Sequence, residues 1–154
     1  MTQERILITG GAGYIGSVLF PELLKKGYKV RIIDNIRYNS TPILFQSMMN
    51  PDFEFIKGDI RDREALKDAL KDVDCIIHLA AIVGLPACKQ NPQLAQEVNI
   101  DGTKNILDLR NNIPIIFAST ISNYGRVKNP DQPCTEETPL NPNSSVIRII
   151  HWIM

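Results

Sequence analysis

The sequence predicts an α/β fold, a doubly wound parallel sheet of about five strands. Short apolar runs alternate with segments of helical periodicity, a glycine-rich stretch follows the first run, and an aspartate ends the second. Strands that alternate with helices lie parallel and are joined by right-handed crossovers. This pattern predicts the strand order 3-2-1-4-5, with ligands bound at the carboxyl ends of the strands.

Five segments carry the β-type pattern of short apolar runs bounded by turn residues. The fourth, DCIIHLAA, is continuous enough for a strand that is buried on both faces. We expect strands at residues 5–9, 29–33, 53–56, 74–81 and 113–120.

Apolar residues at helical spacing predict the crossovers between these strands. We expect helices at residues 14–26, 61–72 and 92–110, and one helical turn around residues 44–49. In the first helix, the residues predicted to face the core are Ile15, Val18, Leu19 and Leu23. Pro21 removes one backbone donor inside this helix, so we expect a local kink there.

Composition narrows the class of protein. The chain has 154 residues, 44% hydrophobic and 22% charged, with 17 basic and 17 acidic side chains, so nothing favours nucleic acid as a partner. Three cysteines without C-x-x-C spacing argue against a metal site and suit a reducing cytosol. No secretory pattern and no apolar run of roughly 18 residues is present. We therefore expect a cytoplasmic protein without metal or membrane contacts.

The stretch TGGAGYIG at residues 9–16 has the glycine spacing of a phosphate-binding turn. Gly10, Gly13 and Gly16 let a strand turn sharply, let the backbone touch a pyrophosphate, and let the helix pack on the strand. The first helical amides and the helix dipole then point at the phosphates. A tight strand–helix turn without a ligand is the structural alternative.

Asp34 ends the second strand, where a carboxylate can accept a hydrogen bond from a ribose hydroxyl. Together with the glycines, it predicts that a dinucleotide binds. Its negative charge favours NAD, because it would repel the 2′-phosphate of NADP. Arg37 lies close by and keeps NADP open as an alternative, although a solvated loop arginine is the simpler interpretation.

Further motifs follow in order along the chain: GDI at 58–60, HLAA at 78–81, VN at 98–99 and STISNYG at 119–125. With the glycines and Asp34, this set resembles the extended short-chain dehydrogenases. More narrowly, it resembles the NAD-dependent sugar-nucleotide epimerase/dehydratase family, which includes UDP-glucose 4-epimerase. The resemblance runs from residue 5 to about residue 144. It implies a Rossmann fold, NAD as cofactor and a nucleotide sugar as substrate.

The resemblance also implies which residues contact the phosphates and which lie along the cofactor. The phosphate loop would consist of Gly10, Gly13, Tyr14, Ile15 and Gly16. The cofactor would lie against the small side chains that follow the fourth strand, Leu79, Ala80 and Ala81. Core packing is the alternative for the two alanines.

At the adenosine end, the resemblance implies four residues. Asp34 and Asn35 would hold the ribose, while Asp59 and Ile60 would flank the adenine. The carboxylate of Asp59 would accept a hydrogen bond from the adenine amino group. The alternative for Asp59 is that it caps the helix expected at residues 61–72.

At the reactive end, the resemblance implies that the hydroxyl of Thr120 bonds the sugar oxygen that is oxidised. A position at the end of an edge strand is the alternative for Thr120. Asn99 would fix the local backbone. We do not assign His78 as a base, because a histidine on an apolar strand is more often a satisfied core residue.

Residues 124–128, YGRVK, have the Tyr-x-x-x-Lys spacing of the family's catalytic pair. That pair works on a helix, where the lysine lies one turn from the tyrosine and lowers its pKa. Gly125 and Pro130 make a helix here implausible, so we interpret YGRVK as a chance match.

The resemblance stops between Ser144 and Val146, before the expected catalytic helix, and VIRIIHWIM does not resume it. We therefore expect a truncated chain, with a frameshift as one cause. Residues 1–121 would form the NAD-binding domain, and residues 122–154 a loop and an apolar tail without a second domain.

These expectations give two functions from different classes. The first is the NAD-binding portion of a nucleotide-sugar epimerase or dehydratase, inactive as this short chain. The second is a non-catalytic NAD-binding module, such as a redox sensor or a partner subunit. A homodimer is one assembly that the resemblance allows.

Overall fold

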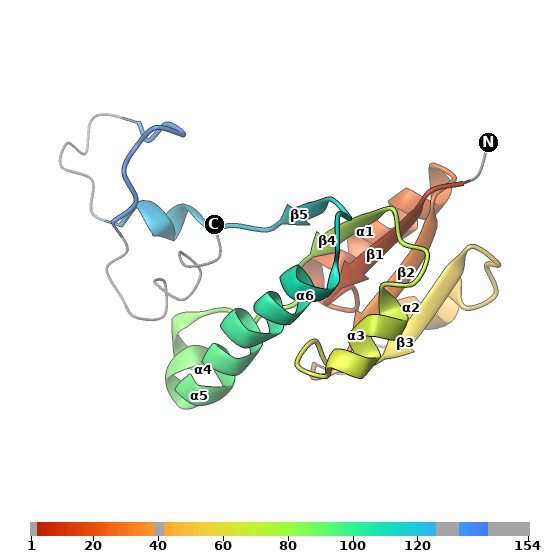
Figure 1. Ribbon diagram of the computed structural model, residues 1–154, viewed down its shortest axis with the longest axis horizontal. Coiled ribbons are helices and arrows are strands. Elements are labelled where there is room, and N and C mark those ends of the chain that lie inside the picture. Colours follow the sequence, from red (N-terminus) through yellow and green to blue (C-terminus); the bar gives the residue numbers. More distant parts are fainter. Residues whose placement is uncertain (1–2, 39–41, 126–132, 142–154) are drawn as a thin grey trace.

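The computed structural model describes residues 3–38, 42–125 and 133–141. Within them, helices cover both faces of one parallel sheet (Figure 1). The strands are β1 (Arg5–Thr9), β2 (Lys29–Asp34), β3 (Phe53–Lys57), β4 (Cys75–His78) and β5 (Ile115–Phe117). Their order, β3-β2-β1-β4-β5, confirms the predicted topology.

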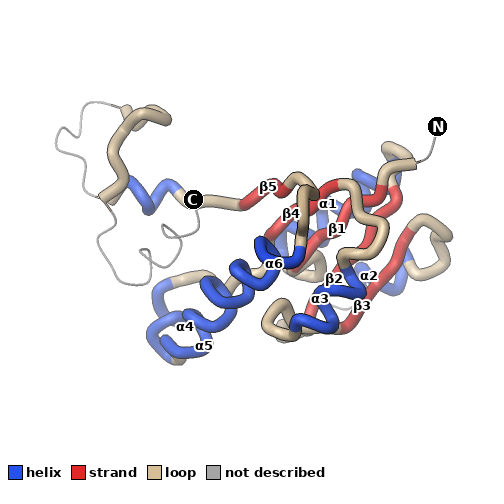
Figure 2. The backbone as a smooth tube through the Cα atoms, in the orientation of Figure 1, coloured by secondary structure: helices blue, strands red, loops and turns tan. Residues whose placement is uncertain are grey.

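The helices connect these strands as crossovers (Figure 2). They are α1 (Tyr14–Lys25), α2 (Pro42–Ser47), α3 (Arg63–Ala69), α4 (Leu85–Gln90), α5 (Pro92–Gln96) and α6 (Thr103–Leu109). A π-helical segment, Glu97–Gly102, joins α5 to α6, and a 3₁₀ turn, Ile121–Tyr124, follows β5.

Alternate strand residues divide the core into two layers, because successive side chains point to opposite faces of a sheet. Leu7 and Ile33 pack with the layer that contains α3 and α6. Ile8 and Ile32 pack with the layer that contains α1 and α2. The sheet is therefore buried on both faces near β1 and β2, as a parallel sheet requires.

The register brings the carboxyl ends of the strands to one edge. Thr9 lies opposite Ile33 of β2 and opposite His78 of β4. Asp34, the last residue of β2, lies opposite Lys57 of β3. The loops that carry the predicted site residues therefore all leave the sheet on the same side.

The buried face of α1 differs from the prediction. Ile15 and Val18 are 59% and 69% exposed, although the other two predicted positions pack against the core. The buried positions are Gly16 and Phe20, and the Phe20 ring stacks on Phe53 with 5.1 Å between ring centroids. The pattern of apolar residues missed this face because Gly16, which has no apolar side chain, is not counted in it. The helix continues through its proline, and the kink stays a prediction.

The expected helix at 92–110 is three segments, and α4 before it was not predicted. Asn91 separates α4 from α5: its extended φ of −144° ends one helix, and its side chain accepts a hydrogen bond from Leu94 N to begin the next. Pro92 then occupies the first turn, where no donor is lost. Strands β4 and β5 end earlier than the predicted 74–81 and 113–120.

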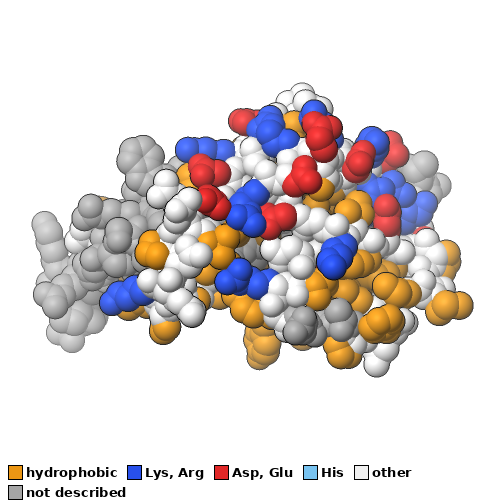
Figure 3. Space-filling model, turned by 90° about the horizontal axis from the view of Figure 1, so that it is seen from below, with side chains coloured by type: hydrophobic (Ala, Val, Ile, Leu, Met, Phe, Trp, Pro, Cys, Tyr) orange, Lys and Arg blue, Asp and Glu red, His pale blue; other side chains and the backbone are white. Residues whose placement is uncertain are grey.

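Exposed large hydrophobic side chains are concentrated on and around α1 and α2. Figure 3 shows hydrophobic side chains gathered along one side of the molecule and charged ones along another. No helix in the described ranges is both long and apolar enough to span a bilayer.

A buried arginine ties the sheet to the end of α3. Arg31 of β2 is only 7% exposed, and its Nη1 donates to the carbonyls of Ala69 at 2.9 Å and Lys71 at 2.6 Å. Its Nε donates to Glu54 at 2.7 Å. The carbonyls at a helix C-terminus lack hydrogen-bond donors within the helix, and Arg31 supplies the donors here.

We expect Arg31→Met to lower the free energy of unfolding by about 2 kcal/mol, because it leaves the carbonyls of Ala69 and Lys71 without a donor. Urea unfolding followed by circular dichroism measures this. The matched control, Glu54→Gln, removes the charge of the half-exposed partner but keeps an acceptor for Nε, and should cost less than Arg31→Met. Equal losses in the two variants would contradict the role of the buried carbonyl contacts.

Candidate functional site

The glycine-rich turn between β1 and α1 is shaped by two glycines that have no room for a side chain. Gly10 has a left-handed φ of +70°, and a Cβ on it would lie 2.6 Å from the backbone of Ala80. A Cβ on Gly16 would overlap the carbonyl of Gly11. The turn therefore packs directly on the end of β4, and α1 packs directly on the turn.

Gly13 differs from both. Its φ of −77° suits any residue, and the one atom that its Cβ would approach within 4 Å is the carbonyl oxygen of Gly10, at 3.1 Å. A side chain at this position would therefore need only a small shift of the Gly10 carbonyl, unlike one at Gly10 or Gly16. Gly13 is the N-cap of α1, a helix of 12 residues, and as a glycine it has no side chain to cap the first amides.

Asp34 links the end of β2 to the glycine-rich turn. One carboxylate oxygen accepts a hydrogen bond from Ala12 N at 3.1 Å, and the other accepts from Ile36 N at 2.7 Å. A carboxylate has about four acceptor positions. Among the described residues, Asp34 therefore keeps capacity to accept from a further hydroxyl.

Two neighbouring cavities lie at this edge of the sheet. The first, about 110 Å³, is lined by the ends of β2 and β3, and the second, about 580 Å³, by the start of α1 and the segment after β5. Both contain Gly10, Gly13, Leu79, Ala80 and Ala81.

The structure brings every predicted site residue to one of these two cavities. Those in the first cavity alone are Asp34, Asn35, Asp59 and Ile60. Those in the second alone are Tyr14, Ile15, Gly16, Asn99 and Thr120. Residues that are far apart in the sequence thus form one continuous site.

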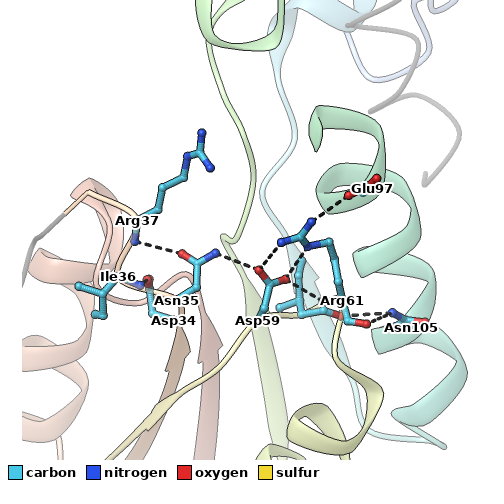
Figure 4. Close-up of polar contacts among 9 residues, drawn as sticks. Asp34, Asn35, Ile36, Arg37, Asp59, Arg61, Glu97 and Asn105 are labelled. Atoms are coloured by element: carbon cyan, nitrogen blue, oxygen red, sulfur yellow. Dashed lines mark hydrogen bonds and ion pairs between the residues drawn. The ribbon is translucent and has the colours of Figure 1, made fainter. Parts of the chain in front are cut away.

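Asp59 follows β3 and lies among hydrogen-bond donors (Figure 4). Asn35 donates to it at 3.0 Å, and Arg61 donates through its backbone N–H and its guanidinium at 2.9–3.0 Å. The hydrogen bonds from Arg61 lower the pKa of Asp59 to about 2, so the carboxylate is ionised at neutral pH. The expected alternative for Asp59 is wrong: the residue that caps α3 is Asp62.

Asn99 lies on the π-helical segment and is 4% exposed. Its Oδ1 accepts from Ile82 N at 2.8 Å, and its Nδ2 donates to Ile82 O at 2.9 Å. This pair of bonds holds the backbone just after Ala81, where the chain leaves β4 along both cavities. A π-helical turn of this kind is frequent at functional sites.

His78 is a buried structural residue, as predicted. Its Nδ1 is 2.5 Å from the hydroxyl of Thr9, and its Nε2 is 2.8 Å from the hydroxyl of Thr103. Burial lowers its pKa from the ordinary 6.5 to about 4. A neutral imidazole with both nitrogens bonded connects β1, β4 and α6, and it is poorly placed to act as a base.

Thr120 precedes the 3₁₀ turn, and its hydroxyl accepts a hydrogen bond from Ser122 N at 3.3 Å. Tyr124 ends that turn, and Gly125 follows with a left-handed φ of +62°. A left-handed residue breaks a helix, which agrees with the interpretation of YGRVK as a chance match. The last residues of YGRVK, 126–128, and the apolar tail from residue 146 lie outside the described residues.

Sequence reasoning missed Arg61, which also lines the first cavity and forms an ion pair with Glu97 at 2.8 Å. Its position two residues after Asp59 was a usable signal. Within the described residues, no group of three or more His, Cys, Asp or Glu side chains could hold a metal ion.

The strand order, the glycine-rich turn and the acid at the end of β2 define a Rossmann-fold domain of the short-chain dehydrogenase class. A family profile described as GDP-mannose 4,6 dehydratase matches residues 7–145. The chain belongs to this family of NAD-dependent epimerases and dehydratases, which confirms the resemblance read from the sequence.

Individual relatives agree with this assignment. UDP-glucose 4-epimerase 2 of Oryza sativa is 33% identical over 150 residues, 90% of this chain and 36% of the relative. The solved UDP-Glc/GlcNAc 4-epimerase of Campylobacter jejuni is 29% identical, with a TM-score of 0.87 over 96% of this chain and 46% of that one. A dTDP-glucose 4,6-dehydratase of Streptomyces venezuelae, solved with NAD, is 30% identical, with a TM-score of 0.85 over 97% and 49%. The chain thus spans less than half of each.

We expect stability to fall as pH decreases from about 6.5 to about 4, because His78 stays neutral when folded while the unfolded chain binds the proton. The full loss is roughly 3 kcal/mol. Urea unfolding at pH 7, 5.5 and 4.5 measures it, and His78→Gln should flatten the decline. A decline of equal slope in that variant would show that other groups cause it.

Proposed function

We propose that residues 1–121 bind NAD and form the cofactor half of a nucleotide-sugar epimerase or dehydratase. The observation that carries this proposal is the space beside Gly13. The fold crowds a Cβ there less than at Gly10 or Gly16, and the position is the N-cap of α1. A pyrophosphate at this helix start needs the space and the amides, which gives a reason for glycine beyond the contact with the Gly10 carbonyl.

The two cavities suit the two ends of a dinucleotide. In the first, Asp59 and Ile60 would flank the adenine, and Asp34 and Asn35 would hold its ribose. In the second, the nicotinamide and the sugar would lie between the start of α1 and Thr120. The glycine-rich turn belongs to both cavities and would hold the pyrophosphate between them.

Asp34 supports NAD rather than NADP. Its carboxylate is fixed by two backbone N–H groups, so it cannot move away from a 2′-phosphate without breaking them. A ribose 2′-hydroxyl, in contrast, can donate to a remaining acceptor position. Bound NAD would accept a hydride from a sugar carbon, and Thr120 would orient the sugar oxygen.

The chain printed here has four tyrosines, and one alone, Tyr124, is followed by a lysine at the required spacing, across Gly125 with its left-handed φ of +62°. They are Tyr14, Tyr28, Tyr38 and Tyr124. Thr120 alone is too weak a base to take the proton of a sugar hydroxyl. We therefore infer that this chain binds the cofactor without completing the reaction, and that the proton acceptor must come from elsewhere in the enzyme.

Gly13→Val should abolish NAD binding, since the branched side chain would fill the pyrophosphate position, while the domain stays folded after a small shift of the Gly10 carbonyl, which lies 3.1 Å from the added Cβ. Isothermal titration with NAD measures the affinity, and thermal unfolding checks the fold. As a contrast, Gly16→Ala should destabilise the domain itself, because its Cβ overlaps the Gly11 carbonyl. Unchanged NAD affinity in Gly13→Val would sink the assignment.

The isolated chain, loaded with NAD, should show no turnover of UDP-glucose or dTDP-glucose, because YGRVK, the one tyrosine–lysine pair with the required spacing, is interrupted by Gly125 and is not expected to move the proton. A coupled assay for the epimerised or dehydrated sugar checks this, with the Campylobacter jejuni epimerase as positive control. Measurable turnover would overturn the inferred inactivity and also the alternative of a non-catalytic NAD-binding module. NAD binding without turnover, joined to capture of a specific partner, would favour that alternative.

A further inference from the structure

The carboxylate of Asp59 accepts four hydrogen bonds, two on each oxygen (Figure 4). Oδ1 accepts from the backbone N–H of Arg61 at 2.9 Å and from its Nε at 3.0 Å. Oδ2 accepts from Nη2 of Arg61 at 2.9 Å and from Nδ2 of Asn35 at 3.0 Å. A carboxylate has about four acceptor positions, so all of those on Asp59 are in use.

The two donors are held very differently. Arg61 contributes three of the four bonds, and its Nη1 is fixed from the far side by Glu97 at 2.8 Å. Asn105 also holds this loop, because its Nδ2 donates to the carbonyls of Ile60 and Arg61, each at 3.3 Å.

Asn35 contributes one bond from a neutral amide on an exposed residue. Among the described residues, its Oδ1 accepts from Arg37 N alone, at 3.1 Å, two residues along the same loop. A charged group with several bonds is costly to remove from a carboxylate, whereas a single neutral donor exchanges readily. Asn35 is therefore the donor that a ligand can replace.

We propose that Arg61 is a positioning residue, which holds Asp59 to select a base with an exocyclic amino group, and that Asn35 occupies this acceptor until the base replaces it. This inference rests on the proposed binding of NAD. An amino group from the adenine would take the place of the Asn35 amide on Oδ2, and the amide would be released toward the ribose.

The selectivity follows from the charge state of Asp59. The carboxylate stays ionised at neutral pH, so it accepts hydrogen bonds and donates none. Adenine presents an amino donor to it, while hypoxanthine presents a carbonyl oxygen that would be repelled. Because Arg61 fixes both oxygens, Asp59 cannot rotate away from the wrong base.

The experiment compares the affinities for NAD and for nicotinamide hypoxanthine dinucleotide, which differ in the C6 group and in the proton on the adjacent N1. The wild-type chain should prefer NAD roughly tenfold or more, the value of one hydrogen bond to a charged group. Arg61→Met should reduce the preference to below about threefold, because Asp59 is then free to turn. Glu97→Gln, which removes only the outer anchor of Arg61, should reduce it by a smaller factor.

Two control variants separate positioning from other effects. Arg5→Met removes the same charge at the opposite end of β1, where Arg5 pairs with Asp72, and should leave the preference unchanged. Asn35→Ala removes the exchangeable donor and should keep the preference at or above the wild-type value, even where it weakens both ligands through the ribose.

Each outcome decides between the possibilities. If Arg61→Met and Glu97→Gln weaken both dinucleotides equally and leave the preference intact, Arg61 only supports the fold and the inference is overturned. A wild-type chain that binds both dinucleotides equally well also overturns it, while the proposed NAD binding stands. A wild-type chain that binds neither dinucleotide overturns both proposals.

Discussion

The site depends on the direct contact between the first turn and the end of β4. Gly10 takes a left-handed conformation there, and the position of its absent Cβ lies 2.6 Å from Ala80. Because β1 stands between β2 and β4, this contact lies where the order of the sheet reverses, the place at which doubly wound sheets bind ligands. Both cavities share this turn, so any side chain at Gly10 would separate them from the sheet that positions them.

Asp34 and Asp59, at the ends of the neighbouring strands β2 and β3, are hydrogen-bonded in different ways at this edge of the sheet. Asp34 takes one backbone donor on each oxygen and keeps acceptor capacity, whereas Asp59 takes four donors, three of them from Arg61. Two unpaired carboxylates so close together would repel each other and any phosphate nearby. The guanidinium of Arg61 offsets one of these charges. The edge can therefore present two fixed acceptors beside a turn that suits an anion.

The sequence predicted the strand order, the glycine-rich turn and the acid after β2, because each depends on neighbouring residues. It failed where distant residues decide the local structure. Gly16 is buried in α1 because it meets the preceding turn, which a pattern of apolar side chains cannot reveal. Arg61 follows Asp59 closely, but its second partner, Glu97, is 36 residues away on a π-helical segment that no propensity indicates. Tertiary contacts therefore set the finer geometry of the site.

The two ends of the site are not equally supported by this chain. The first cavity lies between the ends of β2, β3 and β4, with Leu94 and Val98 on its far side, and Asn35, Asp59 and Arg61 in its lining are bonded to one another. The second ends at β5, a strand of three residues on which Ile116 is 59% exposed. The proposed recognition of the base would therefore depend on contacts that lie within the described residues. The proposed role of Thr120 at the sugar would depend on the second cavity, beside this short strand, so binding of the base and reaction at the sugar would be separable.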